Sequence, residues 1–335
     1  MTYSMSCKAG SNYLTQLIRI MASLLTIVLL AGCSSDQERW GKLLAEHQAL
    51  TTNKLMKLQT MIEAQRIPNT QMLDIYAQTV ASLEPDKAKL INLLAADSRV
   101  DGPMFSNLKQ RLDIANSEVA GAPQLGQVAT DDLLSEFASI SSAADPQNFN
   151  MMLTDPLNVL ADLSNGALPR VAALSQEANA QINKDAENYP GQQLVGNPQY
   201  GEWQTDSSGS SFWAWYGGYR LLGDLFDNRR IGYDSWGRHR SYSYYNDYGR
   251  SAYTSPSQYK NQQMVDARAK KKFQSSGKTF QSPYARTRTG PAQAAAVAKS
   301  ANSSSFRSSY SSSSTSTSSS RNASRSSSRS SSRSK

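Results

Sequence analysis

Apolar residues recur at intervals of three and four positions through most of the chain between residues 36 and 190. This spacing places them along one face of an α-helix, so each run predicts an amphipathic helix that buries its apolar stripe. The runs cover residues 40–50, continued after a phase slip by 55–62, then 72–83, 90–94, 105–119, 133–140, 157–163 and 171–182. No stretch here alternates with period two over a useful length, so the predicted fold class is mainly α, a bundle of short amphipathic helices.

Residues typical of helix ends separate these runs. Thr70 is expected to cap a helix N-terminus, and Pro85 is expected to occupy the first turn of the next helix. Gly102, which precedes a proline, and Asn165, which precedes a glycine, are expected to interrupt the helical pattern. Thr130 is followed by two aspartates and predicts another capped N-terminus, because acids there meet the positive end of the helix dipole.

The composition changes abruptly near residue 190. Residues 191–259 contain 16 of the chain's 29 aromatic residues, and every positive charge among them is an arginine. Arginine stacks on aromatic rings better than lysine does, so we expect arginine–aromatic packing in this segment. The residues from Asp206 to Gly209 are typical of a hairpin turn between two short strands. The segment therefore predicts a small aromatic-rich module, irregular apart from its hairpin, that packs on the helical domain.

The same aromatic residues support a second interpretation. Residues 212–226 are densely apolar and contain tryptophan and tyrosine, which favour the headgroup level of a bilayer, so this stretch would contact a membrane or a protein partner. Residues 233–259 combine arginine with tyrosine, a combination that stacks on bases or sugar rings. Two aspartates dilute the charge there, and no specific nucleic-acid partner is predicted.

Charge is distributed unevenly along the chain, whose formal net charge is +8. Residues 260–335 carry 15 lysines and arginines and one acid, and residues 300–335 include 22 serines. Such a segment cannot bury enough apolar surface to offset the entropy of ordering, so a disordered basic tail is predicted. We expect the tail to bind anionic polymers of the cell envelope non-specifically, through contacts that weaken with salt. A solubilising tail, or a tail docked on residues 34–259 with their net charge of −8, are the alternatives.

The first 32 residues have the pattern of a secretory signal peptide. Lys8 and Arg19 precede an uncharged apolar run at residues 20–30, which is too short to cross a bilayer, since a spanning helix takes about 20 residues. The tetrapeptide Leu30-Ala31-Gly32-Cys33 follows this run directly. In sequence and in position it resembles the lipobox of bacterial lipoproteins.

This resemblance implies that the chain is cut before Cys33 and that the Cys33 sulfur is diacylated, so that Cys33 becomes the lipidated N-terminus. Several acyl chains on one residue give stable membrane anchoring. An aspartate directly after the lipidated cysteine resembles a signal for retention in the inner membrane, and this chain has Ser34 at that position. The implied location is therefore the outer membrane, where the protein would face the periplasm or the surface. Cys7 would be lost with the signal peptide, and the mature chain would then form no disulfide.

Candidate catalytic chemistry is sparse. The sequence contains no phosphate-binding glycine loop, nucleophile elbow or paired-histidine zinc motif, and its two histidines are His47, in a helical stripe, and His239, between two arginines. No cofactor, metal or small-molecule substrate is predicted. We therefore expect a structural or adaptor lipoprotein rather than an enzyme. The alternatives are an accessory factor that docks a membrane protein complex through the aromatic module, and a hydrolase of envelope polymers.

The predicted organisation has four parts. They are a signal peptide at residues 1–32, a lipid-anchored helical domain at 33–190, the aromatic-rich module at 191–259 and the disordered basic tail at 260–335.

Overall fold

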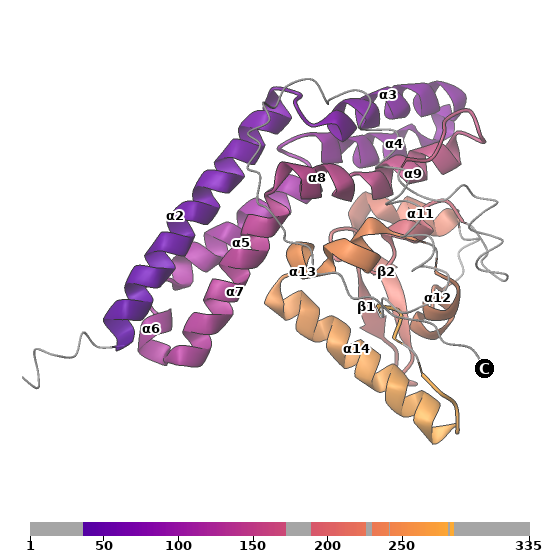
Figure 1. Cartoon of the computed structure of the whole chain (residues 1–335). Helices are drawn as coiled ribbons and strands as arrows, with labels where there is room; N and C mark the ends of the chain where they lie inside the picture. The colour runs from indigo at the N-terminus through magenta and orange to yellow at the C-terminus, as the bar shows by residue number, and fades with distance from the viewer. Residues whose placement is uncertain (1–35, 172–188, 226–229, 241, 281, 285–335) are drawn as a thin grey trace, which may run out of the picture.

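The computed structural model describes residues 36–171, 189–225, 230–240, 242–280 and 282–284. Helices dominate these residues, and the sheet within them is a two-stranded hairpin. Figure 1 shows two groups of helices that meet at an angle, with a smaller group gathered around the hairpin. The predicted mainly α fold class with a small hairpin module is therefore confirmed.

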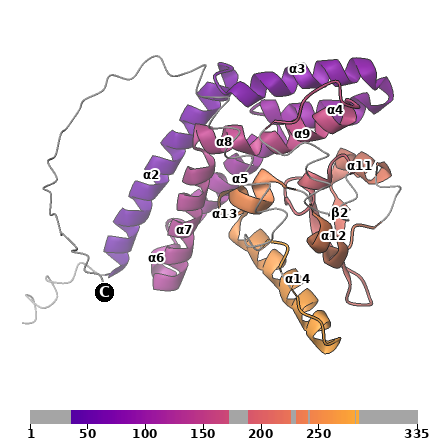
Figure 2. The same ribbon diagram turned by 45° about the vertical axis from the view of Figure 1, so that its right-hand side comes forward.

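The first group of helices is built on two long helices, α2 (Asp36–Glu63) and α7 (Gln127–Ala143). They lie side by side, together with α5 (Pro103–Glu118) and the single-turn helix α6 (Ala122–Leu125) (Figures 1 and 2). The N-terminal end of α2 lies beside α6 at one extremity of the molecule.

The buried stripe of α2 differs from the stripe that the apolar pattern predicts. It consists of Leu44, Thr51, Leu55, Leu58 and Ile62, at intervals of seven, four, three and four residues and without a phase slip. Leu43 and Leu50, which belong to the predicted stripe, are 40% and 51% exposed. Thr51 fits the buried stripe because its hydroxyl donates a hydrogen bond of 3.3 Å to the carbonyl of Phe137 in α7.

The second group contains α3 (Pro68–Leu83), α4 (Ala88–Ala95), α8 (Pro146–Met152) and α9 (Thr154–Leu163). Nine of the ten residues of α9 are buried, so this helix forms the centre of the core. The sequence pattern did not predict α8, which begins at an N-cap, Asp145, whose carboxylate accepts hydrogen bonds from the backbone N–H groups of the second and third helical residues.

Two of the predicted helix boundaries are wrong. Thr70 does not cap α3, which begins two residues earlier, because Pro68 needs no hydrogen-bond partner for its nitrogen and fits the first helical position. Thr130 does not cap α7, which begins after Gly126, where φ is 100°. Both threonines are buried and donate their hydroxyl groups to backbone carbonyls, Thr70 to Ile67 at 2.6 Å and Thr130 to Gly126 at 3.1 Å.

The other predicted boundaries agree with the structure. Pro85 opens a 3₁₀ turn (Pro85–Lys87) that leads into α4, and Gly102 precedes α5. The chain leaves α9 through Asn165 and Gly166, whose φ angles are 51° and 89°. The last predicted helix, at residues 171–182, lies outside the described residues beyond its first position.

The hairpin of the aromatic-rich module matches its prediction. Its strands β1 (Gly201–Thr205) and β2 (Ser211–Trp215) pair antiparallel. The carboxylate of Asp206 closes the turn by accepting backbone N–H groups from Ser208 at 2.9 Å and Ser210 at 3.0 Å. Hydrogen bonds from Ser208 and Ser210 hold the pKa of Asp206 below its usual value.

Short helical turns surround this hairpin. They are the 3₁₀ turns Gln192–Leu194 and Gly217–Arg220, the helices α11 (Leu221–Asp224), α12 (Tyr233–His239) and α13 (Arg250–Tyr253), and a π-turn at Tyr245–Gly249. None of them exceeds two turns, so the module depends on packing rather than on regular secondary structure.

Aromatic rings fill the centre of the module. The ring of Trp203 lies 4.8 Å from that of Tyr233, edge to face, and 5.1 Å from that of Trp236, measured between ring centroids. The guanidinium carbon of Arg250 lies 4.6 Å from the ring centroid of Tyr259, and that of Arg230 lies 4.7 Å from the ring centroid of Phe212. The predicted arginine–aromatic packing within residues 191–259 is therefore confirmed.

Two buried carboxylates join the module to the helical core. Asp97, in the 3₁₀ turn (Ala96–Ser98) that follows α4, accepts a hydrogen bond of 2.8 Å from the hydroxyl of Tyr200. Asp155 of α9 accepts three hydrogen bonds, from the hydroxyl of Ser243 and from the backbone N–H groups of the next two residues. Because both aspartates are at most 1% exposed, these contacts hold the module in one position on the helices.

The helix α14 (Pro256–Ser275) corrects the prediction of a tail that is disordered from residue 260. A capping box starts this helix, since Ser255 accepts the backbone N–H of Gln258 and the Gln258 side chain accepts the backbone N–H of Ser255. Val265 and Ala269, one turn apart, are buried. This apolar stripe is short and is followed by charged, low-complexity sequence, so the sequence pattern did not predict the helix. Residues 285–335 lie outside the described residues.

Candidate functional site

The predicted lipid-attachment residue, Cys33, lies outside the described residues, three positions before the start of α2. Within the part of the chain that the structure describes, no helix is long and apolar enough to cross a membrane. The same residues contain no group of three or more histidine, cysteine, aspartate or glutamate side chains placed to hold a metal ion.

The helix α14 and the residues just after it carry exposed positive charge, which we call the basic face. It consists of Lys260, Arg268, Lys270, Lys271, Lys272 and Lys278. The one acid of α14, Asp266, is half-buried and accepts hydrogen bonds from the hydroxyls of Tyr233 at 2.6 Å and Ser282 at 2.7 Å. This carboxylate forms no ion pair with a lysine or arginine of the described residues, so none of the cations of the basic face is paired with it.

Two residues of the basic face attach α14 to the hairpin. Arg268 donates a hydrogen bond of 2.8 Å to the hydroxyl of Thr205, and Lys272 donates one of 3.1 Å to the hydroxyl of Ser210. Four lysines of the basic face form no ion pair with any residue that the structure describes, namely Lys260, Lys270, Lys271 and Lys278. These ammonium groups are free to contact phosphate or carboxylate groups of another molecule.

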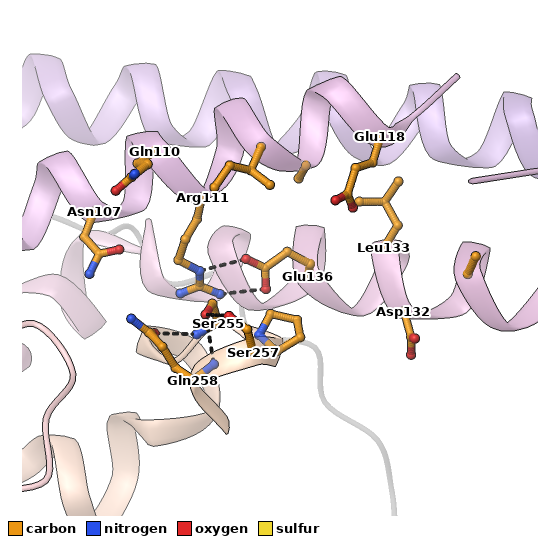
Figure 3. Close-up of a pocket in the computed structure, with 14 residues that line it drawn as sticks. Asn107, Gln110, Arg111, Glu118, Asp132, Leu133, Glu136, Ser255, Ser257 and Gln258 are labelled. Carbon is orange, nitrogen blue, oxygen red and sulfur yellow. Dashed lines mark hydrogen bonds and ion pairs between the residues drawn. The ribbon is translucent and has the colours of Figure 1, made fainter. Parts of the chain in front are cut away.

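A groove with a volume of about 470 Å³ lies between α5 and α7 and ends at the N-terminus of α14 (Figure 3). Ala115 and Leu133 are buried in its floor, and Ile114, 53% exposed, forms part of one wall. Glu118 and Asp132 are exposed at its edge and form no ion pair within the described part of the chain. The groove therefore combines an apolar floor with negative charge.

A buried ion pair crosses this groove. The Nε and Nη2 atoms of Arg111 in α5 donate hydrogen bonds of 2.7 and 2.8 Å to the two carboxylate oxygens of Glu136 in α7 (Figure 3). The remaining Nη1 atom donates a hydrogen bond of 2.8 Å to the carbonyl of Ala252 in α13. Since each guanidinium nitrogen has a protein acceptor, Arg111 joins three helices and is not free to bind a ligand.

The hydroxyl groups at one end of the groove take part in the start of α14. The Ser255 hydroxyl accepts the hydrogen bond that caps α14 and lies 3.1 Å from the Ser257 hydroxyl. The residues that line the groove include neither histidine nor cysteine. An apolar floor with exposed carboxylates complements a basic, amphipathic segment of another molecule.

The aromatic module exposes fewer rings than its composition suggests. Trp213, Trp215 and Trp236 are buried. The most exposed of its described rings belong to tyrosines, and the values are 43% for Tyr216, 40% for Tyr259 and 39% for Tyr248. Most of the tryptophan surface is therefore enclosed, and the rings that remain at the surface for contact with a membrane, a protein partner or sugars are mainly those of tyrosines.

The placement of the basic residues was missed at the sequence level, although a signal for it exists. Ser255, Pro256 and Gln258 form the sequence of a capping box with proline at the first helical position, which predicts a helix start. The groove has no comparable local signal, because residues 107–136 and 255–258 meet only in the folded chain.

Comparison with known proteins finds no family model, no curated protein and no solved structure that matches this chain.

Proposed function

We propose that this protein is a lipid-anchored lipoprotein of the cell envelope with a structural or adaptor role. Cys33 carries the acyl chains and fixes the N-terminus to the outer membrane. The basic face of α14, together with the basic residues that follow it, binds anionic polymers of the envelope without sequence specificity.

The basic face is the observation that carries this proposal. Five of its lysines and arginines lie on one helix, whose acid accepts hydrogen bonds from the hydroxyls of Tyr233 and Ser282. A helix that is already ordered loses less conformational entropy on binding than a disordered chain does. Residues 285–335 add nine lysines and arginines and no acid, so the positive region extends along the chain.

The arrangement of the helices supports an adaptor between membrane and polymer. In Figures 1 and 2 the N-terminal end of α2 and the C-terminal end of α14 both point to the lower side of the molecule. A membrane anchor at Cys33 would therefore keep a polymer that is bound to α14 close to the membrane surface.

The variant Cys33→Ala tests the anchor. We expect the wild-type chain to lose residues 1–32, to gain the mass of its acyl chains and to sediment with membranes, because several acyl chains give stable anchoring. We expect the variant to remain unprocessed or to become soluble. Intact-mass spectrometry and membrane fractionation measure both outcomes, and Cys7→Ala is the matched control that leaves the anchor in place. A wild-type chain that stays whole and soluble in the cytosol would refute the proposal.

The triple variant Lys270→Gln, Lys271→Gln, Lys278→Gln tests the basic face. We expect its affinity for purified lipopolysaccharide to fall by about tenfold in low salt, with a shallower dependence of binding on salt, because about one counterion is released for each phosphate contact. Fluorescence anisotropy at several salt concentrations measures both effects.

The control for this variant makes the same change of charge on α2, through Lys42→Gln, Lys54→Gln and Lys57→Gln, three exposed residues. We expect the control to bind lipopolysaccharide nearly as the wild type does. Equal losses in the two variants would show that net charge alone governs binding and would contradict a role for the basic face.

A further inference from the structure

The turn between α6 and α7 exposes two apolar side chains, Leu125 and Val128, which we call the α6–α7 tip. They are 80% and 75% exposed, the highest values among the large exposed apolar side chains of the described residues. Gly126 lies between them with a φ of 100°, so the chain turns sharply and presents both side chains outward. Because both side chains are apolar and largely uncovered, the tip gains free energy if an apolar environment covers it.

The α6–α7 tip lies near the level of the first turns of α2. The hydroxyl of Thr51 and the carbonyl of Phe137 mark a common level on α2 and α7, which run side by side (Figure 1). With a helical rise of about 1.5 Å per residue, Val128 lies about 14 Å below this level and Asp36 about 22 Å below it. Leu43, 40% exposed, lies about 12 Å below it and so level with the tip.

The site of the proposed anchor is close to this end of the molecule. Cys33 precedes Asp36 by three residues, which span at most about 10 Å even when fully extended. A bilayer that holds the acyl chains of Cys33 is therefore within reach of the tip. Trp40 is half-buried near the start of α2, and tryptophan is typical of the headgroup level of membranes.

We propose that the α6–α7 tip inserts Leu125 and Val128 into the headgroup region of the anchoring bilayer, so that α2 and α7 stand on the membrane in a fixed orientation. This inference rests on the proposed anchoring through Cys33. A bilayer fits the tip better than a second copy of the chain does, because two side chains cover far less area than a stable protein interface needs. A small apolar contact suffices for a bilayer that the anchor already holds nearby.

Quenching of Trp40 fluorescence tests this orientation. The chain that begins at Cys33 is coupled through its one thiol to a maleimide lipid in phosphatidylcholine vesicles that contain brominated acyl chains. The quenching due to Trp40 is the difference between the wild type and Trp40→Phe. We expect clear quenching in the wild type, and in Leu125→Ser with Val128→Ser we expect the docked population to fall by about tenfold or more.

The matched control is Ile75→Ser with Leu83→Ser, which removes two exposed apolar side chains from α3, away from the anchored end (Figure 1). We expect the control to be quenched like the wild type. Absence of Trp40 quenching, equal losses in both double variants, or dimerisation of the coupled chain through the tip would overturn the inference. Chemical coupling does not depend on acylation in cells, so a failure of the anchor proposal, seen as an unmodified Cys33 in the native protein, stays distinct from a failure of this inference.

Discussion

Replacing Asp155 by alanine is expected to detach the aromatic-rich module from the helical core. The carboxylate of Asp155 accepts hydrogen bonds of 2.9 Å from the Ser243 hydroxyl, 2.8 Å from the Tyr244 N–H and 3.0 Å from the Tyr245 N–H. Removing it leaves three buried donors without an acceptor in a site from which water is excluded. We expect the free energy of unfolding to fall by about 3 kcal/mol or more.

Urea denaturation, followed by tryptophan fluorescence and by far-ultraviolet circular dichroism, measures this loss. Four of the five tryptophans lie in the module, so fluorescence reports the module, whereas circular dichroism reports mostly the helices. For Asp155→Ala we expect the transition followed by fluorescence to occur at a lower urea concentration than the transition followed by circular dichroism. Asp131→Ala removes an exposed carboxylate from α7 and is the control, expected to change little. A wild-type transition for Asp155→Ala would contradict the role of this carboxylate.

The helices could be predicted from the sequence because their stripes are local. Residues such as Leu73 and Val80, one face of α3, recur within a single element and are buried as expected. The prediction of the buried stripe of α2 was partly wrong for a physical reason, because Thr51 buries its hydroxyl against α7 while Leu50 remains exposed. The acceptor of this hydroxyl is the carbonyl of Phe137, far away in the sequence, so the local pattern of apolar residues could not predict that Thr51 is buried.

The core of the aromatic module could be predicted only in composition. Its buried tyrosines require partners for their hydroxyls, and these partners come from distant helices. Tyr253 donates a hydrogen bond of 2.8 Å to the carbonyl of Ala143, and Tyr219 donates one of 3.2 Å to the carbonyl of Leu93. The density of tyrosine suggested a surface for stacking, but these contacts place the rings inside the fold.

The candidate site was predicted in its chemistry and not in its position. An excess of lysine and arginine after residue 260 already indicated an anionic partner. These basic residues are ordered because they lie on a helix that buries Val265 and Ala269, two small apolar residues within a polar stretch. Their burial requires the folded module beside them. A disordered segment was therefore predicted where the folded module stabilises a helix.

The stability of the protein is expected to fall as the pH rises from about 4 to about 7. Burial raises the pKa of Asp97 and of Asp155 from 3.8 to about 7, because it disfavours the charged form, although hydrogen bonds from Tyr200 and from other donors act in the opposite direction. Between these two pH values the folded chain binds more protons at the two carboxyls than the unfolded chain does. The contribution of these two carboxyls to the free energy of unfolding is thus greatest at the acid end of this pH range and decreases toward neutral pH.

The difference between the wild type and Asp97→Asn isolates this effect from the other carboxyls. The amide cannot ionise, so the variant loses the contribution of Asp97 to the pH dependence, on the order of 3 kcal/mol over the window. At about pH 4.5 the carboxyl of Asp97 is protonated, and we expect the variant to be close to the wild type in stability, because its neutral amide accepts the Met104 N–H and can donate to the Tyr200 hydroxyl oxygen. Toward pH 8 the wild type loses the stabilising contribution of the protonated carboxyl, and we expect the variant to become the more stable of the two. Urea titrations at a series of pH values decide the matter, since parallel curves for the two proteins would mean that Asp97 titrates alike in the folded and unfolded chain.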